Sequence, residues 1–183
     1  MIPRPLPVVV LALLLAGCTD SSSASGGTET VEGVSVTVPE GWSVTDPPDA
    51  PGVVAARGWS PGRPGHLLQV IVGCEGTVDE LVTGAVREPR GPLVVTDATE
   101  DRASHRVPGL DEARRLQLTL GAGRPDDADT VRTAGLYGQR GDALVLVELS
   151  QLARDVNDEL ADEVLDSVRV DADALDAACE QQP

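Results

Sequence analysis

The chain has 183 residues, and 30 acidic against 14 basic side chains give it a formal net charge of −16 at pH 7. So acidic a chain lacks the basic surface that nucleic-acid binding requires, and it disfavours direct docking on anionic lipid. Aromatic residues make up 2% of the chain and phenylalanine is absent, so valine, leucine and alanine have to build the core.

Residues 1–17 have the features of a lipoprotein signal peptide. Arg4 precedes an apolar stretch, Val8–Leu15, which is far shorter than the ~20 residues needed to span a bilayer. Ala16 and Gly17 then place small residues before Cys18, as a lipoprotein cleavage site requires. We therefore expect lipidation of Cys18 and a protein held on the extracytoplasmic face of a cell membrane. An ordinary secretory signal followed by an unrelated cysteine is the alternative.

Three further parts follow the signal peptide. Residues 18–30, which begin with the lipidated cysteine, are rich in serine, glycine and threonine, a composition that predicts a flexible tether. Residues 31–170 have the length of one domain with one core, and residues 171–183 form an acidic tail. In an exported protein, Cys74 and Cys179 are expected to form a disulfide that fixes this tail. Two free thiols are the alternative; two cysteines without nearby histidine do not make a zinc site.

Much of the domain has the residue pattern of β-strands. Val34–Val38 alternates apolar and polar residues, which predicts a half-buried strand. Leu67–Val72 and Ala143–Leu149 are nearly all apolar and predict central strands. Further strands are predicted at 42–44, 53–57, 93–97, 103–107, 116–120 and 131–137, with a glycine- and proline-rich connection at 58–65.

Two segments have helical periodicity. Thr77-Val78-Asp79-Glu80 is a capping box, and it predicts a helix over 78–87 that Pro89 ends. An apolar stripe that includes Leu160 and Val164 predicts a second helix over 156–168. Strands with short connections favour antiparallel pairing, and both helices must bury their stripes on the sheet. The predicted fold class is therefore α+β: an antiparallel β-sheet with two packed α-helices.

The order of these elements resembles the PsbP/Mog-like fold group, which includes actinobacterial lipoproteins of the LpqN type. The resemblance covers residues 31–170. It rests on Val34-Ser-Val-Thr-Val-Pro-Glu-Gly-Trp42, which is similar to the opening strand and P-x-G-W turn of that group, and on the closing helix at 160–168. It implies a sheet with helices packed on it and a role in binding or assembly rather than catalysis.

Signals for catalysis or metal binding are few. Gly58–Gly62 spells the G-x-S-x-G motif of hydrolases with Ser60 as nucleophile, but its proline and glycines exclude the helix that the motif needs after the serine. His66 and His105 flank different strands, so we do not expect them to bind a metal together. Asp126–Asp129 lacks the glycine and the bidentate glutamate of an EF-hand loop. No catalytic residue, metal site or cofactor is therefore predicted.

These observations favour a non-catalytic, lipid-anchored binding or scaffolding module of the cell envelope. Its partner, an envelope protein or a small ligand, would bind at a sheet edge or at Trp59, because an aromatic residue in a Gly/Pro-rich loop often anchors a partner. Local packing of Trp59 is the alternative. The other functional hypotheses are a small serine hydrolase that uses Ser60 and a carrier of a small apolar ligand between sheet and helices.

Overall fold

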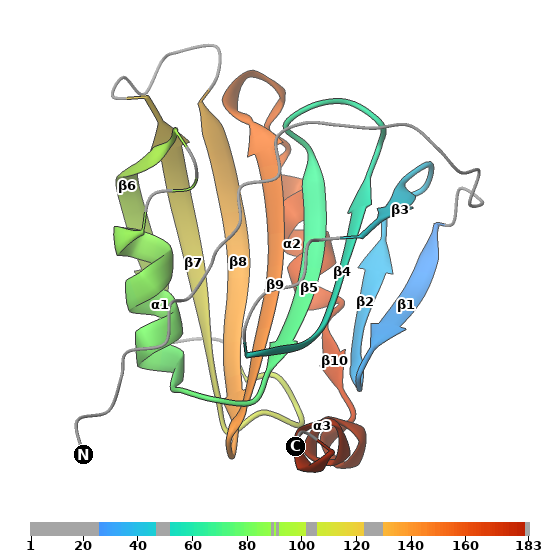
Figure 1. The fold of residues 1–183 in the computed structure, drawn as a ribbon. Coiled ribbons are helices and arrows are strands. Elements are labelled where there is room, and N and C mark those ends of the chain that lie inside the picture. The colour runs from blue at the N-terminus through green and yellow to red at the C-terminus, as the bar shows by residue number, and fades with distance from the viewer. Residues whose placement is uncertain are drawn as a thin grey trace.

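The computed structural model describes residues 26–46, 52–88, 90, 92–101, 106–122 and 130–181. Within these residues the chain forms two antiparallel sheets and three α-helices (Figure 1), which confirms the predicted α+β class. Cys18, the predicted signal peptide, His105 and Asp126–Asp129 lie outside the described residues. No helix in the described part of the chain is long and apolar enough to cross a membrane.

The larger sheet has seven strands in the order β3-β4-β5-β9-β8-β7-β6, and every neighbouring pair is antiparallel. The strand at its centre is β9, which contains the apolar run that predicted a central strand. The seven strands are β3 (Ser43–Thr45), β4 (Val53–Ser60), β5 (Leu67–Gly73), β6 (Val94–Asp101), β7 (Glu112–Gly121), β8 (Val131–Arg140) and β9 (Ala143–Leu152).

The prediction of a strand at 103–107 is wrong for the part of that segment that the structure describes. Residues 106 and 107 are not in a strand, and residues 103–105 lie outside the described residues. The strand at this edge, β6, instead ends at Asp101.

A smaller sheet has the order β1-β2-β10, with strands β1 (Gly27–Val31), β2 (Val34–Val38) and β10 (Arg169–Val170). The valines of β2 are at most 1% exposed, as their alternation predicts. Strand β1 corrects the predicted tether, because residues 27–30 already belong to the sheet. Its sequence is mostly polar, and its pairing with β2, from Gly27 opposite Val38 onward, holds it in place.

Helix α1 (Val78–Arg87) has the predicted bounds and cap. The backbone N–H of Glu80 donates to Thr77 Oγ1 at 3.2 Å, and the N–H of Thr77 donates to Glu80 Oε2 at 2.9 Å. The apolar stripe of the helix packs against one face of the large sheet, where Tyr137 is among its neighbours. Figure 1 shows α1 in front of the sheet.

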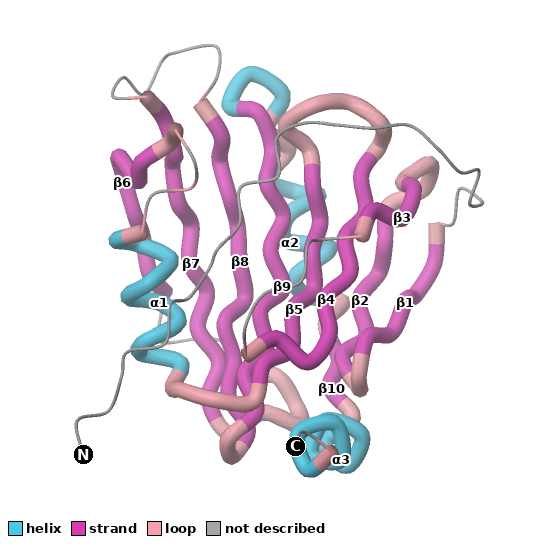
Figure 2. The backbone as a smooth tube through the Cα atoms, viewed as in Figure 1, coloured by secondary structure: helices cyan, strands magenta, loops and turns pink. Residues whose placement is uncertain are grey.

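Helix α2 (Asp158–Asp166) lies on the other face, behind the sheet in Figure 1. Its buried residues pack in one core with the valines of β2 and with the side chains of β5 and β9 that point away from α1. The large sheet is thus covered by α1 on one face, and by α2 and the small sheet on the other. Figure 2 shows that a short 3₁₀ helix (Ala153–Asp155) joins β9 to α2.

A third helix, α3 (Ala172–Glu180), corrects the prediction of an irregular acidic tail. Asp171 caps it by accepting from the N–H of Ala174 at 3.2 Å, and Leu175 is fully buried. Alanine dominates its apolar positions, which leaves only a weak periodicity in the sequence. The turn between β1 and β2 packs on α3 at Gly33, where φ is +82° and a Cβ would lie 2.8 Å from the Asp171 carbonyl oxygen.

Cys74 and Cys179 form the predicted disulfide, with their Cα atoms 5.4 Å apart. Cys74 follows β5, and Cys179 lies in the last turn of α3. The bond therefore fixes α3 to the end of the large sheet at which β5 finishes.

Candidate functional site

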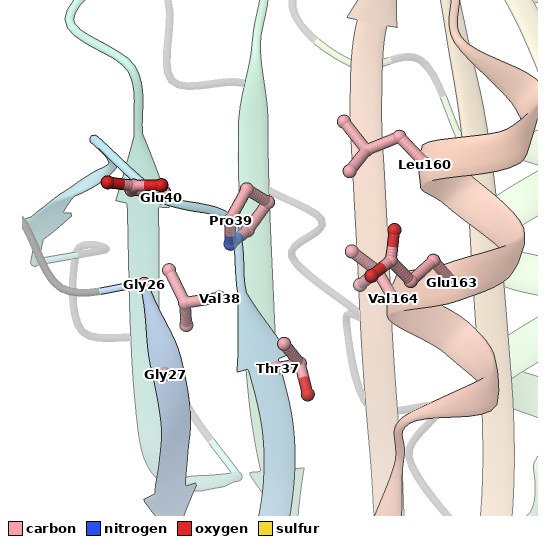
Figure 3. A pocket seen from close by; sticks show the side chains of 9 residues that line it. All are labelled: Gly26, Gly27, Thr37, Val38, Pro39, Glu40, Leu160, Glu163 and Val164. Atoms are coloured by element: carbon pink, nitrogen blue, oxygen red, sulfur yellow. The ribbon is translucent and has the colours of Figure 1, made fainter.

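One candidate binding surface in the described part of the chain is a groove between β2 and α2, which we call the β2–α2 groove. It has a volume of about 440 Å³, within the range of ligand pockets. Figure 3 shows Leu160 and Val164 pointing from α2 toward β2. The lining residues are Gly26, Gly27, Thr37, Val38, Pro39, Glu40, Leu160, Glu163 and Val164.

The strand wall of the groove ends in a tight turn. The N–H of Trp42 donates to the carbonyl of Pro39 at 3.3 Å, and Gly41 takes the left-handed conformation with φ +81° that glycine adopts without steric cost. Trp42 is buried in the core, so the turn is anchored on its far side. Glu40 thereby projects at the tip, where its side chain is exposed.

The helix wall is positioned by its two ends. At the start, Asn157 Oδ1 accepts from the N–H of Leu160 at 3.0 Å. At the other end, Ser167 Oγ accepts from the N–H of Thr37 at 2.8 Å and donates to the carbonyl of Val164 at 2.6 Å. This side-chain bridge ties α2 to β2 directly, at Thr37 in the wall of the groove.

The charges at the groove are unbalanced. Glu40 and Glu163 are exposed, and neither has an ion-pair or hydrogen-bond partner for its carboxylate in the described part of the chain. Elsewhere on α2, Asp162 pairs with Arg115 at 3.2 Å, and Asp166 also pairs with Arg115. The groove thus offers apolar surface and two free carboxylates, with no basic, histidine, serine or cysteine side chain among its lining residues. Such a lining is suited to binding a ligand that has both apolar and polar groups.

The opposite face of the sheet contains a buried polar cluster. The Glu148 carboxylate on β9 is 1% exposed. It accepts from Arg90 Nη1 at 2.5 Å and Nη2 at 3.0 Å, from the Tyr137 hydroxyl at 2.9 Å and from Gln69 Nε2 at 3.4 Å. We call these four residues the Glu148 cluster. Gly135 makes room for it, because a Cβ there would lie 2.6 Å from the ring of Tyr137.

The groups of the Glu148 cluster change one another's ionisation. Burial lowers the pKa of Arg90, but the Glu148 carboxylate and Tyr137 raise it by more, so the pKa of Arg90 lies above its ordinary value. Burial raises the pKa of the Tyr137 phenol well above its ordinary value, and the Glu148 carboxylate adds to this shift. Both side chains therefore stay protonated. The cluster joins the loop after α1, which carries Arg90, to the large sheet through the ion pair with Glu148.

The position of Trp59 rules out a partner anchor. Its side chain has no exposed surface, because β4 continues through Gly58–Ser60 and pairs Trp59 with Val44 on one side and Leu68 on the other. The glycine and prolines around it suggest a loop, but Gly58 is required by packing: a Cβ there would lie 2.6 Å from Thr45 Oγ1. Local packing of Trp59 is therefore the correct alternative.

Ser60 is not part of a nucleophile elbow. It is the last residue of β4, and residues 61–66 lead to strand β5 without a helix. Its hydroxyl accepts from the N–H of Gly62 at 3.3 Å.

His66 is 5% exposed, and its Nδ1 lies 3.4 Å from the carbonyl oxygen of Pro64. Among the residues that the structure describes, no three His, Cys, Asp or Glu side chains are grouped to hold a metal.

The sequence does not predict the β2–α2 groove, because its walls come from segments far apart in the chain. The Glu148 cluster has a visible signal: Glu148 is the one charged residue in the apolar strand β9. An acidic side chain in a central strand needs a buried partner.

Solved structures share the architecture of this chain. The solution structure of cyanobacterial PsbP from Synechocystis sp. PCC 6803 has a TM-score of 0.51 and 17% identity, and the match covers 86% of this chain and 99% of that one. The fold is PsbP-like. The match supports the PsbP-like part of the predicted resemblance and shows the fold alone.

A second similar structure is the Ran-binding protein Mog1p from Saccharomyces cerevisiae. It has a TM-score of 0.42 and 15% identity, with 85% of this chain and 90% of that one covered. No protein-family model and no curated protein matches the sequence.

Proposed function

We propose that this protein is a lipid-anchored, extracytoplasmic binding module that is not an enzyme and that binds its partner in the β2–α2 groove. The observation that carries this proposal is the lining of the groove. Apolar side chains from β2 and α2 form its floor, two free carboxylates stand at its rim, and its lining holds no histidine, serine, cysteine or basic side chain. The PsbP-like fold is compatible with such a role, but function has to be argued from the site.

The anchoring part of the proposal rests on the sequence up to Cys18. Seven residues separate Cys18 from Gly26, and Gly26 lines the groove. A lipid on Cys18 would therefore keep the groove within roughly 30 Å of the membrane surface. A disulfide is typical of proteins in an oxidising compartment, so the Cys74–Cys179 bond supports an extracytoplasmic location.

The anchor is tested by metabolic labelling of cells with a clickable fatty acid. The protein should be labelled and found in the membrane fraction, and the Cys18→Ala variant should lose the label. If the unsubstituted protein stays unlabelled and in the cytosol, the proposed anchoring and location are wrong.

The groove is tested by photocrosslinking in intact cells. A benzoylphenylalanine side chain at Gly27 has room, because a Cβ there meets nothing within 4 Å. The matched control carries the same side chain at Asp142, an exposed residue of the β8–β9 turn. A defined adduct from position 27 that is absent from position 142 is expected. The same adducts from both positions, or none from position 27, would contradict binding in the groove.

A further inference from the structure

We infer that the β2–α2 groove binds an extended segment of a partner protein that carries a positive charge between apolar side chains. This inference rests on the proposed function, in which the groove is the binding surface. It names the chemistry of the partner, which follows from the charge, the floor and the lip of the groove.

The charge of the groove selects for a cation. Glu40 comes from the turn after β2 and Glu163 from α2, so carboxylates stand on both walls (Figure 3). Neither has a partner within the described ranges, whereas Asp162 and Asp166, on the same helix as Glu163, share Arg115 as an ion-pair partner. A cationic side chain in the groove would be attracted by both glutamates, and an anionic one would be repelled by both. The net charge of −16 adds long-range attraction for a basic partner.

The floor of the groove requires an apolar neighbour for that cation. Pro39 and Leu160 are half-buried and offer apolar surface there, above the buried Val38 and Val164, and apolar surface gains free energy when it is removed from water. A fatty acid or an anionic lipid would satisfy this floor but would bring its own negative charge against Glu40 and Glu163. The apolar floor and the two carboxylates together fit a segment in which an aliphatic side chain lies next to arginine or lysine.

The lip of the groove favours a polypeptide over a small amine. Gly26 and Gly27 form this lip at the start of β1, and β1 is an edge strand of its sheet. A glycine in a strand often marks a place where another backbone approaches closely, and a Cβ on Gly27 would meet nothing within 4 Å. Edge strands also present backbone groups to which an extended segment can bind.

The test measures binding of short peptides to the full-length protein in phosphatidylcholine nanodiscs by calorimetry. The first peptide is acetylated and amidated Leu-Arg-Leu-Arg-Leu with a photoreactive central leucine. The others replace both arginines by glutamine or by glutamate, and octylamine serves as a small cation with an apolar tail. We expect the arginine peptide to bind most tightly and to crosslink to groove residues.

Two pairs of substitutions separate the groove from the general acidity of the protein. Glu40→Gln with Glu163→Gln should weaken binding of the arginine peptide about tenfold, since one exposed pair contributes up to about fivefold. Glu75→Gln with Asp142→Asn removes two exposed charges outside the groove and should change binding less than about twofold.

Three results would overturn the inference. The first is an equal loss of affinity for the arginine peptide from the two pairs of substitutions. The others are binding of the glutamine or glutamate peptide, or of octylamine, as tight as that of the arginine peptide. In each case an adduct from position 27 in cells would still support the groove as a binding surface. Failure of the inferred chemistry is thus distinguishable from failure of the proposed function.

Discussion

Removing the positive charge of the Glu148 cluster should destabilise the protein strongly. Replacing Arg90 by methionine keeps an apolar stem of similar length but leaves the Glu148 carboxylate, which is 1% exposed, with only Tyr137 and Gln69 as donors. Breaking a buried ion pair in this way costs about 3–5 kcal/mol. We expect the lower value, about 3 kcal/mol, because two of the hydrogen bonds to the carboxylate remain.

Urea unfolding of the Arg90→Met variant beside the unsubstituted protein measures this effect. With a slope of about 2 kcal/mol per molar urea, Arg90→Met should lower the midpoint by about 1.5 M. Adding Glu148→Gln to this variant removes the unpaired charge and leaves an acceptor for the Tyr137 hydroxyl, so it should recover about 2 kcal/mol. In the unsubstituted protein, Glu148→Gln should instead be destabilising, because it leaves the Arg90 guanidinium unpaired. If Glu148→Gln lowers the free energy of unfolding equally in both backgrounds, the ion pair does not stabilise the fold.

Three other predictions concern separate features of the fold. Replacing both Cys74 and Cys179 by alanine should lower the free energy of unfolding by about 2–4 kcal/mol in urea unfolding, because a loop of 105 residues is no longer closed in the unfolded chain; an unchanged midpoint would refute this. The raised pKa of Tyr137 means that stability is unaffected by this group below pH ~10 and falls above it by about 1.4 kcal/mol per pH unit, because only the unfolded chain loses the proton; the Tyr137→Phe variant should lack this slope, and an equal slope would exclude Tyr137 as its cause. Gly33→Ala should cost more than Gly41→Ala, for which about 1–2 kcal/mol is expected, because both have a positive φ but only Gly33 has a neighbour within 4 Å of a Cβ; equal melting temperatures would contradict this.

The elements that the sequence predicts well are those whose local signals agree with their tertiary role. Helix α1 has a capping box, an apolar stripe and a terminating proline, and its observed bounds match the prediction. Strand β2 has strict alternation and a buried valine face. In both cases residues close in the chain determine the conformation.

The elements that the sequence does not predict depend on contacts between distant residues. Strand β1 is polar and exists through its pairing with β2, and α3 is held by the disulfide and by packing at Gly33. Trp59 sits among loop-forming residues but is buried by β3 and β5 on its two sides. The β2–α2 groove follows the same rule, because the Thr37–Ser167 bond that ties its two walls together joins two segments 130 residues apart.

The disulfide has a further consequence for how proteolysis would affect the protein. Among the elements that the structure describes, it encloses helices α1 and α2, most of α3 and the strands from β6 to β10. A single cut anywhere between the two cysteines would leave both fragments covalently joined, so they would separate on a gel only after reduction. A single cut in this span would then release no piece of the protein unless the disulfide is also reduced.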